Sequence, residues 1–90
     1  MYRAHIVVRL KSDVMDPQGQ AILEAAQHLG LQEAKSIRTG RYFEVVLEAP
    51  DDGTARSKLS ELCEKLLANP VIETYEIALA PLGSRETHRK

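Results

Sequence analysis

Hydrophobic and polar side chains alternate along the first ten residues of the chain. From Tyr2 to Leu10 the even-numbered positions are apolar, and the odd-numbered positions are polar except for Val7. A period of two sends successive side chains to opposite faces of a β-strand. The pattern predicts a strand over Tyr2–Leu10 with one buried face and one mostly polar face.

The apolar spacing lengthens to three and four residues after Asp16, which is typical of an amphipathic helix. The residues that share this face are Ala21, Ile22, Ala25, Ala26 and Leu29. Asp16 is a favoured N-cap, Pro17 fits the first helical position, and Gly30 suits the position that ends a helix. A helix is therefore predicted over Pro17–Leu29.

Strand-like residues return in the middle of the chain. Leu31–Thr39 is the weaker candidate, because few of its residues favour a strand, whereas Arg41–Ala49 alternates clearly between apolar and polar positions. Thr39-Gly40, between the two, is typical of a tight turn. Two strands joined by a short turn that contains glycine predict a β-hairpin.

A second helix and a last strand follow. The helix has its N-cap candidates at Asp51, Asp52 and Thr54. Its apolar face consists of Ala55, Leu59, Leu62, Cys63, Leu66 and Leu67. Asn69-Pro70 stops the helix, because the residue before a proline avoids helical backbone angles. Val71–Ala80 alternates again and is predicted to be the last strand.

The predicted order is β-α-β-β-α-β, which places the chain in the α+β class with a ferredoxin-like plan. That plan has a four-stranded antiparallel sheet with both helices on one face. The other face would carry Val7, Tyr42, Val46 and Ala78 among charged residues, and we expect it to be used in oligomerisation. Residues 1–80 are predicted to form the single domain, and residues 81–90 a polar, flexible tail.

Composition narrows the classes of function. The formal net charge is -1, whereas proteins that bind nucleic acid usually carry a basic excess. A single cysteine excludes an intramolecular disulfide and a site built on paired thiolates. Neither an apolar run of about 20 residues nor a signal-peptide pattern is visible in the sequence. We expect a cytoplasmic protein that binds neither membrane nor nucleic acid.

Few residues suggest catalytic chemistry. His5, His28 and His88 lack the spacing of zinc ligands and are interpreted as surface residues. Cys63 lies on the apolar face of the second helix and is interpreted as a core residue rather than a nucleophile. No metal site and no catalytic residue are therefore predicted.

Three known uses of a ferredoxin-like plan can be compared with the sequence. An acylphosphatase needs a glycine-rich anion cradle after the first strand, but residues 11–19 hold two aspartates and one glycine. RNA-recognition modules stack bases on exposed aromatic residues, but Glu44 and Glu48 share the face of Tyr42. Domains of the ACT type bind small ligands at a dimer interface, which nothing in the sequence excludes.

Three segments resemble the PurS family, the small subunits of bacterial and archaeal phosphoribosylformylglycinamidine synthase. They are Asp16-Pro17-Gln18-Gly19, Gly40-Arg41-Tyr42-Phe43-Glu44, and the run from Cys63 to Glu73 that contains Leu-Leu-Ala-Asn-Pro-Val-Ile-Glu. The resemblance covers about residues 2–79. Six residues of these segments are interpreted as structural motif residues: Asp16, Pro17, Gly19, Gly40, Tyr42 and Pro70. Capping and turn chemistry explains most of the need for Asp16, Pro17, Gly40 and Pro70.

The resemblance implies a subunit without an active site of its own. In this family a glutaminase subunit, PurQ, releases ammonia, and an ATP-dependent synthetase subunit, PurL, consumes it in purine biosynthesis. PurS forms dimers or tetramers, bridges the two and supports ammonia transfer. The complex uses ATP, magnesium and glutamine, and no cofactor is expected on this chain.

Four residues are the expected partner contacts, because local structure explains them least. They are Gln18, Arg38, Arg41 and Asn69. The first hypothesis is therefore a bridging subunit of this ligase. The second is a separate regulatory domain that binds a small ligand at a dimer interface, and a small hydrolase of the acylphosphatase kind is a weaker third.

Overall fold

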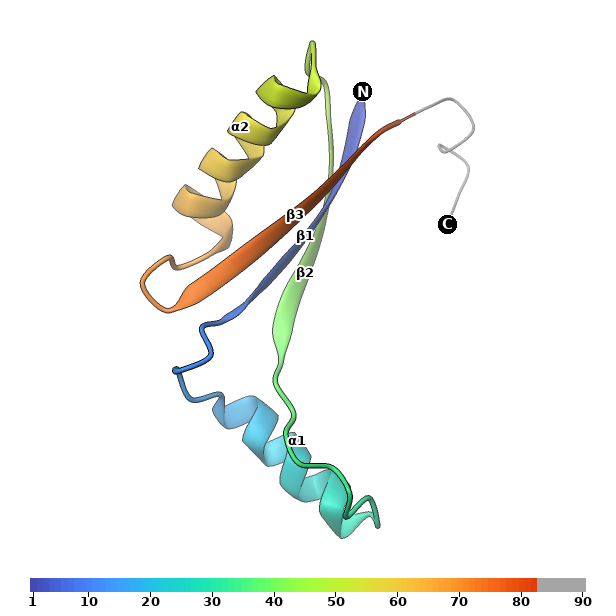
Figure 1. Cartoon of the computed structure of the whole chain (residues 1–90), viewed down its shortest axis with the longest axis vertical. Helices are drawn as coiled ribbons and strands as arrows, with labels where there is room; N and C mark the ends of the chain where they lie inside the picture. The colour runs from blue at the N-terminus through green and yellow to red at the C-terminus, as the bar shows by residue number, and fades with distance from the viewer. Residues whose placement is uncertain (83–90) are drawn as a thin grey trace.

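A computed structural model describes residues 1–82 and shows a three-stranded antiparallel sheet in the order β2-β1-β3 (Figure 1). The elements in chain order are β1 (Tyr2–Leu10), α1 (Pro17–His28), β2 (Gly40–Leu47), α2 (Asp52–Leu62), a π-helical turn η1 (Cys63–Leu67) and β3 (Glu73–Pro81). The strand predicted from the first alternation, β1, is the central one. The antiparallel sheet and the separate helices together confirm the α+β class.

Strand β1 is paired along both edges, with β3 over its whole length and with β2 from Tyr2 to Arg9. Tyr2 lies opposite Leu47 of β2 and opposite Pro81 of β3. The even-numbered residues of β1 point into the core, where Ile6 and Val8 are almost completely buried. The alternation in the sequence therefore identified the correct inner face.

Helix α2 covers this inner face. The carboxylate of Asp51 accepts a hydrogen bond from the Thr54 amide at 2.7 Å, so Asp51 is the cap among the three predicted candidates. The fully buried residues that α2 and η1 place on the sheet are Ala55, Leu59 and Cys63. Inward residues of the edge strands, such as Val45, are only partly buried around this centre.

The predicted fourth strand and the hairpin are wrong for the isolated chain. Residues 31–39 run back toward the sheet without pairing as a strand, and Thr39 leads directly into β2. Side chains replace the expected ladder: the Gln27 amide donates to the Ala34 carbonyl, and the Asp16 carboxylate accepts from the Thr39 amide. The segment is therefore held by α1 instead of by β2.

The prediction that both helices cover one face of the sheet is also wrong. Helix α1 projects beyond the end of the sheet, together with the segment that returns from it (Figure 1). We refer to residues 17–38 as the arm. The radius of gyration is 16.8 Å, whereas about 12 Å is expected for a compact domain of this length.

Much of the apolar face predicted for α1 is exposed as a result. Leu23, which the predicted set did not include, is the buried apolar residue of the helix, while Ile22 and Leu29 are 43% and 89% exposed. The helix ends at His28, and Gly30 has a φ of 113°, which confirms it as the glycine that follows the helix.

The remaining boundaries differ from the predictions by a few residues. β2 begins and ends earlier than predicted, and β3 begins at Glu73 and includes Pro81, which had been assigned to the tail. The predicted tail otherwise lies almost wholly outside the described residues. Among residues 1–82, no helix combines the length and apolar character needed to cross a membrane.

Candidate partner-contact site

An open cavity of about 440 Å³ lies at the end of the sheet from which the arm leaves. Asp16, Pro17 and Gln18 line it from the start of α1, and Gly40 and Arg41 line it from the start of β2. Five residues singled out in the sequence thus meet at one corner of the molecule.

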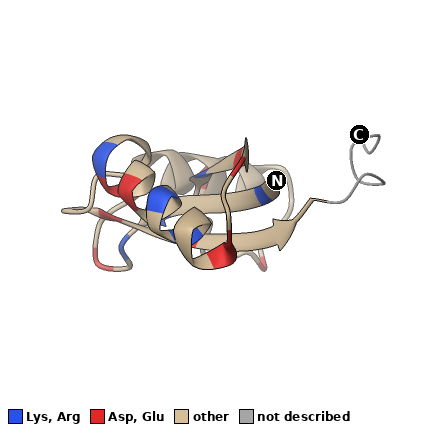
Figure 2. Ribbon diagram, turned by 90° about the horizontal axis from the view of Figure 1, so that it is seen from above, with Lys and Arg blue, Asp and Glu red and all other residues tan. Residues whose placement is uncertain are grey.

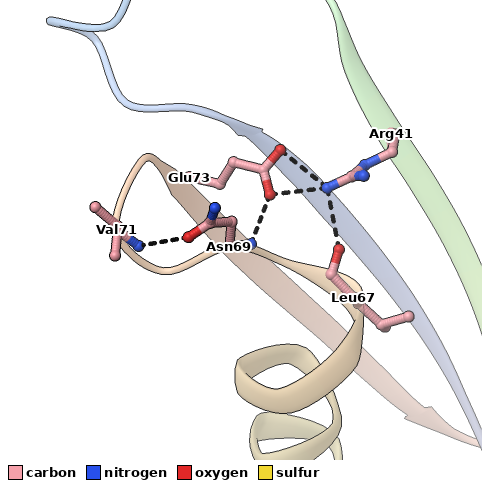
Figure 3. A network of polar contacts seen from close by, with 5 residues as sticks. All are labelled: Arg41, Leu67, Asn69, Val71 and Glu73. Atoms are coloured by element: carbon pink, nitrogen blue, oxygen red, sulfur yellow. Dashed lines mark hydrogen bonds and ion pairs between the residues drawn. The ribbon is translucent and has the colours of Figure 1, made fainter.

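The third side of this corner is formed by Glu73, at the start of β3. Arg41 reaches past β1 and donates from Nη2 to both carboxylate oxygens of Glu73, at 2.8 and 2.9 Å (Figure 3). The same nitrogen donates to the Leu67 carbonyl at 3.1 Å. Arg41 therefore joins the first residues of β2 to the end of η1 and to β3.

Asn69 belongs to the same network through its backbone and its side chain (Figure 3). Its amide donates to Glu73 Oε1 at 2.7 Å, and its Oδ1 accepts from the Val71 amide at 3.1 Å. Pro70 between them restricts the backbone further. These bonds hold the loop in one shape while the Val71 side chain is 79% exposed, so the loop presents an apolar side chain at a fixed position.

Arg38 lies at the edge of this site and does not join the network of Arg41. Its Nη2 donates to the Lys11 carbonyl at 2.9 Å, which connects the arm to the segment after β1. Together with Arg9, Arg38 lines two further depressions, one of about 750 Å³ beside residues 10–13 and one of about 280 Å³ beside Gly40. Of the four predicted contact residues, Gln18 and Arg41 line the same cavity. Asn69 is hydrogen-bonded to Glu73, which also lines that cavity, whereas Arg38 lines the two neighbouring depressions.

Asp16 is the joint between the arm and the sheet. Its carboxylate accepts from the Gly19 amide at 2.9 Å as the N-cap of α1, and from the amide of Thr39 at 2.6 Å. These backbone bonds, that from Thr39 first, hold the pKa of Asp16 below its ordinary value. The predicted cap is confirmed, whereas its second partner, 23 residues away, was not predicted.

Two glycines are placed where a side chain would collide with backbone. A Cβ on Gly19 would meet the carbonyl of Ile37, and a Cβ on Gly40 would lie 2.6 Å from the Val8 carbonyl oxygen. Gly19 therefore lets α1 pack against the returning segment, and Gly40 lets β2 start tightly against β1. Close approach, not turn formation, is the role of Gly40.

Sequence reasoning missed Glu73, the acceptor at the centre of the network. In the sequence, Glu73 is a single carboxylate a few residues after Asn69-Pro70. Its partner Arg41 lies 32 residues away, so no local pattern indicated their pairing. The exposed apolar residues of the arm were missed for a similar reason. Their periodicity predicted burial within the chain.

The outer face of the sheet carries polar contacts between its strands. His5 hydrogen-bonds to Tyr42 through Nδ1, and the two rings stack with centroids 5.8 Å apart. Arg3 pairs with Glu44 at 3.3 Å, and Arg9 pairs with Glu76 at 3.0 Å. Each of these two arginines is thus paired with a glutamate, so they do not form a basic platform for nucleic acid. Figure 2 shows acidic and basic residues interspersed along the ribbon.

The described residues do not gather the ligands of a metal centre. Among residues 1–82, no three His, Cys, Asp or Glu side chains are placed to hold one metal ion. Burial, with a smaller effect of Glu64, raises the pKa of the Cys63 thiol, which opposes thiolate formation. The chemistry available at the corner is recognition by hydrogen bonds, charge and an apolar side chain.

The chain is similar to known proteins in both sequence and fold. A family model described as PurS, phosphoribosylformylglycinamidine (FGAM) synthase, matches residues 3–81. The chain belongs to the PurS family. This confirms the resemblance found in the sequence, and the matched region includes the arm, the corner and all three strands.

Individual PurS proteins match over most of their length. The PurS subunit of FGAM synthase from Synechocystis sp. is 45% identical over 86 residues, which cover 96% of this chain and 86% of that protein. The crystal structure of PurS from Methanocaldococcus jannaschii matches with a TM-score of 0.85 and 34% identity, over 92% of this chain and 100% of that one. A chain in a structure of PurLQS from Thermotoga maritima matches with a TM-score of 0.79 and 28% identity, over 89% and 99% of the two chains.

Proposed function

We propose that this chain is the bridging subunit of an FGAM synthase in purine biosynthesis, where it joins a glutaminase subunit, PurQ, to a synthetase subunit, PurL. The observation that carries the proposal is the match, over nearly the whole chain, with a component of the Thermotoga maritima PurLQS structure. It favours the bridging subunit over the ligand-binding domain and the small hydrolase.

The shape of the molecule supports a bridging role. The arm and the sheet extend the chain over 50 Å in its longest dimension. Apolar side chains are exposed at both parts, with Leu29 on the arm and Val71 beside the corner. We assign these two apolar positions, one on each part of the chain, to contacts with other subunits.

Ammonia transfer requires two active sites to be held in register and shielded from bulk water. A bracket achieves this by raising the effective concentration of one subunit near the other, without a reactive group of its own. The ATP, magnesium and glutamine of the reaction then bind the other subunits. We place the complex in the cytoplasm and this chain in a homodimer or tetramer within it.

We assign the corner to contact with PurL or PurQ. Gln18, Arg41 and Asn69 lie around it, and Arg38 extends it along the arm. Arg41 retains two roles, because its side chain is half exposed although it is paired with Glu73. Its outer edge is open to an acidic or carbonyl group of a partner.

Reconstitution tests the function. PurL and PurQ are assayed with and without this chain for FGAM formation, with glutamine or with ammonia as the nitrogen source. Omission of the chain is expected to abolish the glutamine-dependent rate and to leave the ammonia-dependent rate of PurL intact. A glutamine-dependent rate that persists without the chain would refute the proposal.

The contact residues are tested in the same assay. Gln18→Lys should weaken binding of the chain to the other subunits, because it adds a charge at the exposed edge of the cavity. Gln20→Lys is the matched control, since Gln20 is exposed on α1 but does not line the cavity, and a lysine there can pair with Glu24 in place of the hydrogen bond that Gln20 donates. Equal effects of the two variants would remove the corner from the interface.

A further inference from the structure

Basic residues gather where the arm leaves the sheet, next to the corner but outside the network of Arg41. Arg9 and Arg38 line both of the depressions described above, which therefore adjoin at these two residues. Lys11 lines the larger depression, of about 750 Å³. We refer to Arg9, Lys11 and Arg38 as the basic cluster.

Few acidic groups offset the charge of the basic cluster. Asp13 is the acidic residue among those that line the two depressions. Arg9 pairs with Glu76, but both side chains of this pair are more than half exposed, and an exposed pair contributes little to stability. Among residues 1–82, Lys11 and Arg38 form no ion pair. The cluster therefore retains positive charge that the described part of the chain does not neutralise.

Two neighbouring charged residues belong to the corner instead. Arg41 lines the smaller depression, but it lies opposite Val8 on the inner face of the sheet and is paired with Glu73. Asp16 lines the corner cavity and neither depression, and its carboxylate accepts from backbone amides. Neither residue is counted in the basic cluster for these reasons.

Hydrogen bonds to the backbone hold the cluster in place. Arg38 donates from Nη2 to the Lys11 carbonyl at 2.9 Å, and the Lys11 amide donates to the Ile72 carbonyl at 2.8 Å. Two positive charges are thus brought to one short segment, where they repel each other unless an anion lies between them. Because these groups are ordered before any ligand arrives, an anion would bind with little further loss of entropy.

The larger depression suits a phosphate group better than a carboxylate. A carboxylate is satisfied by one guanidinium in a bidentate pair, whereas a phosphate monoester carries nearly two negative charges and three acceptor oxygens. Ser12 and Thr74 line the depression and add hydroxyl donors to its cations. A volume of about 750 Å³ also lies within the range of small-molecule sites.

We propose that the basic cluster binds a phosphate group, either as inorganic phosphate or as part of a nucleotide. Arg38 and Lys11 supply the unpaired charge, Arg9 adds a third cation at the border of the two depressions, and the hydroxyl groups complete the set of donors. The site lies on this chain alone. It therefore goes beyond the proposed bridging function and does not depend on it.

Titration of the ¹⁵N-labelled chain with inorganic phosphate tests the site by NMR. At constant ionic strength, saturable shifts are expected for the amides of residues 9–13, 38 and 74, which line the larger depression. Shifts of equal size around exposed lysines of α2, or shifts that do not saturate in the millimolar range, would show that phosphate acts only as a general counter-ion. Either result would refute the proposal.

Lys11→Gln is the sharpest variant, because it removes the ammonium group and leaves the carbonyl to which Arg38 donates. It should weaken phosphate binding about tenfold. Lys58→Gln is the matched control, since Lys58 is exposed on α2 and lines neither depression. Equal weakening by the two variants would overturn the site. Arg38→Gln tests the guanidinium in the same titration, and an unchanged affinity in that variant would also count against the proposal.

Two further probes distinguish the sources of the phosphate group. AMP that binds more tightly than inorganic phosphate, with shifts that extend to Tyr42 in the smaller depression, would identify a nucleotide as the ligand. Equal affinities would identify the free anion. Adenosine that binds while inorganic phosphate and AMP do not would contradict a phosphate site.

None of these measurements uses PurL or PurQ. A chain that binds phosphate but is not needed for glutamine-dependent FGAM formation would keep the phosphate site and lose the bridging function. A chain that is needed for that reaction but shows no saturable phosphate binding would give the opposite result.

Discussion

Substitution of Gly19 tests the joint between the arm and the sheet more directly than any change in the core. In Gly19→Ala the new Cβ would meet the carbonyl of Ile37 and would lie 2.9 Å from Oδ2 of Asp16. The nearest atoms belong to backbone and to a carboxylate already held by several donors. They have little freedom to move aside.

The net effect is a balance of two opposite contributions. Alanine stabilises a helix over glycine by about 1 kcal/mol, whereas overpacking a rigid contact costs about 1–3 kcal/mol. Because the obstacle is backbone, we take the upper part of that range and expect a net loss of about 2 kcal/mol. For a domain of this size this corresponds to a fall in Tm of roughly 10 °C.

Gly53→Ala is the matched control for this experiment. Gly53 also lies in the first turn of a helix, but a Cβ there would meet its nearest atom, Asp51 Oδ1, at an ordinary 3.6 Å. The same substitution should therefore stabilise the protein by about 0.5 kcal/mol. Both variants are compared with wild type by thermal and urea unfolding at one protein concentration, because an oligomer's stability depends on concentration. A Gly19→Ala variant as stable as Gly53→Ala would contradict the close packing of α1 on Ile37.

Three further predictions concern charge and reactivity. The pKa of Asp16 is lowered in the folded protein, so its ionised form contributes fully to stability above the unfolded pKa. This contribution is lost as pH falls through the folded pKa. Between pH 6 and pH 3, the free energy of unfolding should therefore fall more steeply in wild type than in Asp16→Asn. Glu73→Gln should lower the free energy of unfolding by about 1–2 kcal/mol, because Arg41 loses a charged acceptor that is mostly shielded from water. Urea titration measures this change. An unchanged free energy of unfolding would show that the bonds of Glu73 do not hold the loop at Asn69. Cys63 should react with a thiol reagent at pH 8 only after unfolding, and rapid labelling of the native protein would contradict its burial.

The sequence predicted those elements whose partners lie within one chain. Strand β1 and helix α2 alternate because each meets the same core from a fixed side, so periodicity identified their buried residues. The stripe of α1 was equally regular, but the helix projects beyond the sheet (Figure 1) and leaves Ile22 and Leu29 exposed. Periodicity states that a face is to be covered and does not state which molecule covers it.

The candidate site was predictable residue by residue but not as an arrangement. Asp16 could be recognised as a cap from its position before Pro17, because capping is local. Its bond to Thr39, and the pairing of Arg41 with Glu73, join residues 23 and 32 positions apart. Contacts at such separation follow from how the strands are ordered, which the sequence pattern left open.

The position of β1 between its two partners has a consequence for biosynthesis. The N-terminal strand cannot be fully paired until Pro81 has left the ribosome, because Tyr2 lies opposite that residue. Pairing between segments so far apart in sequence requires closure of a long loop, which slows folding. During translation, the apolar residues of β1 therefore stay without their second partner strand, and chaperones have their longest opportunity to bind the nascent chain there.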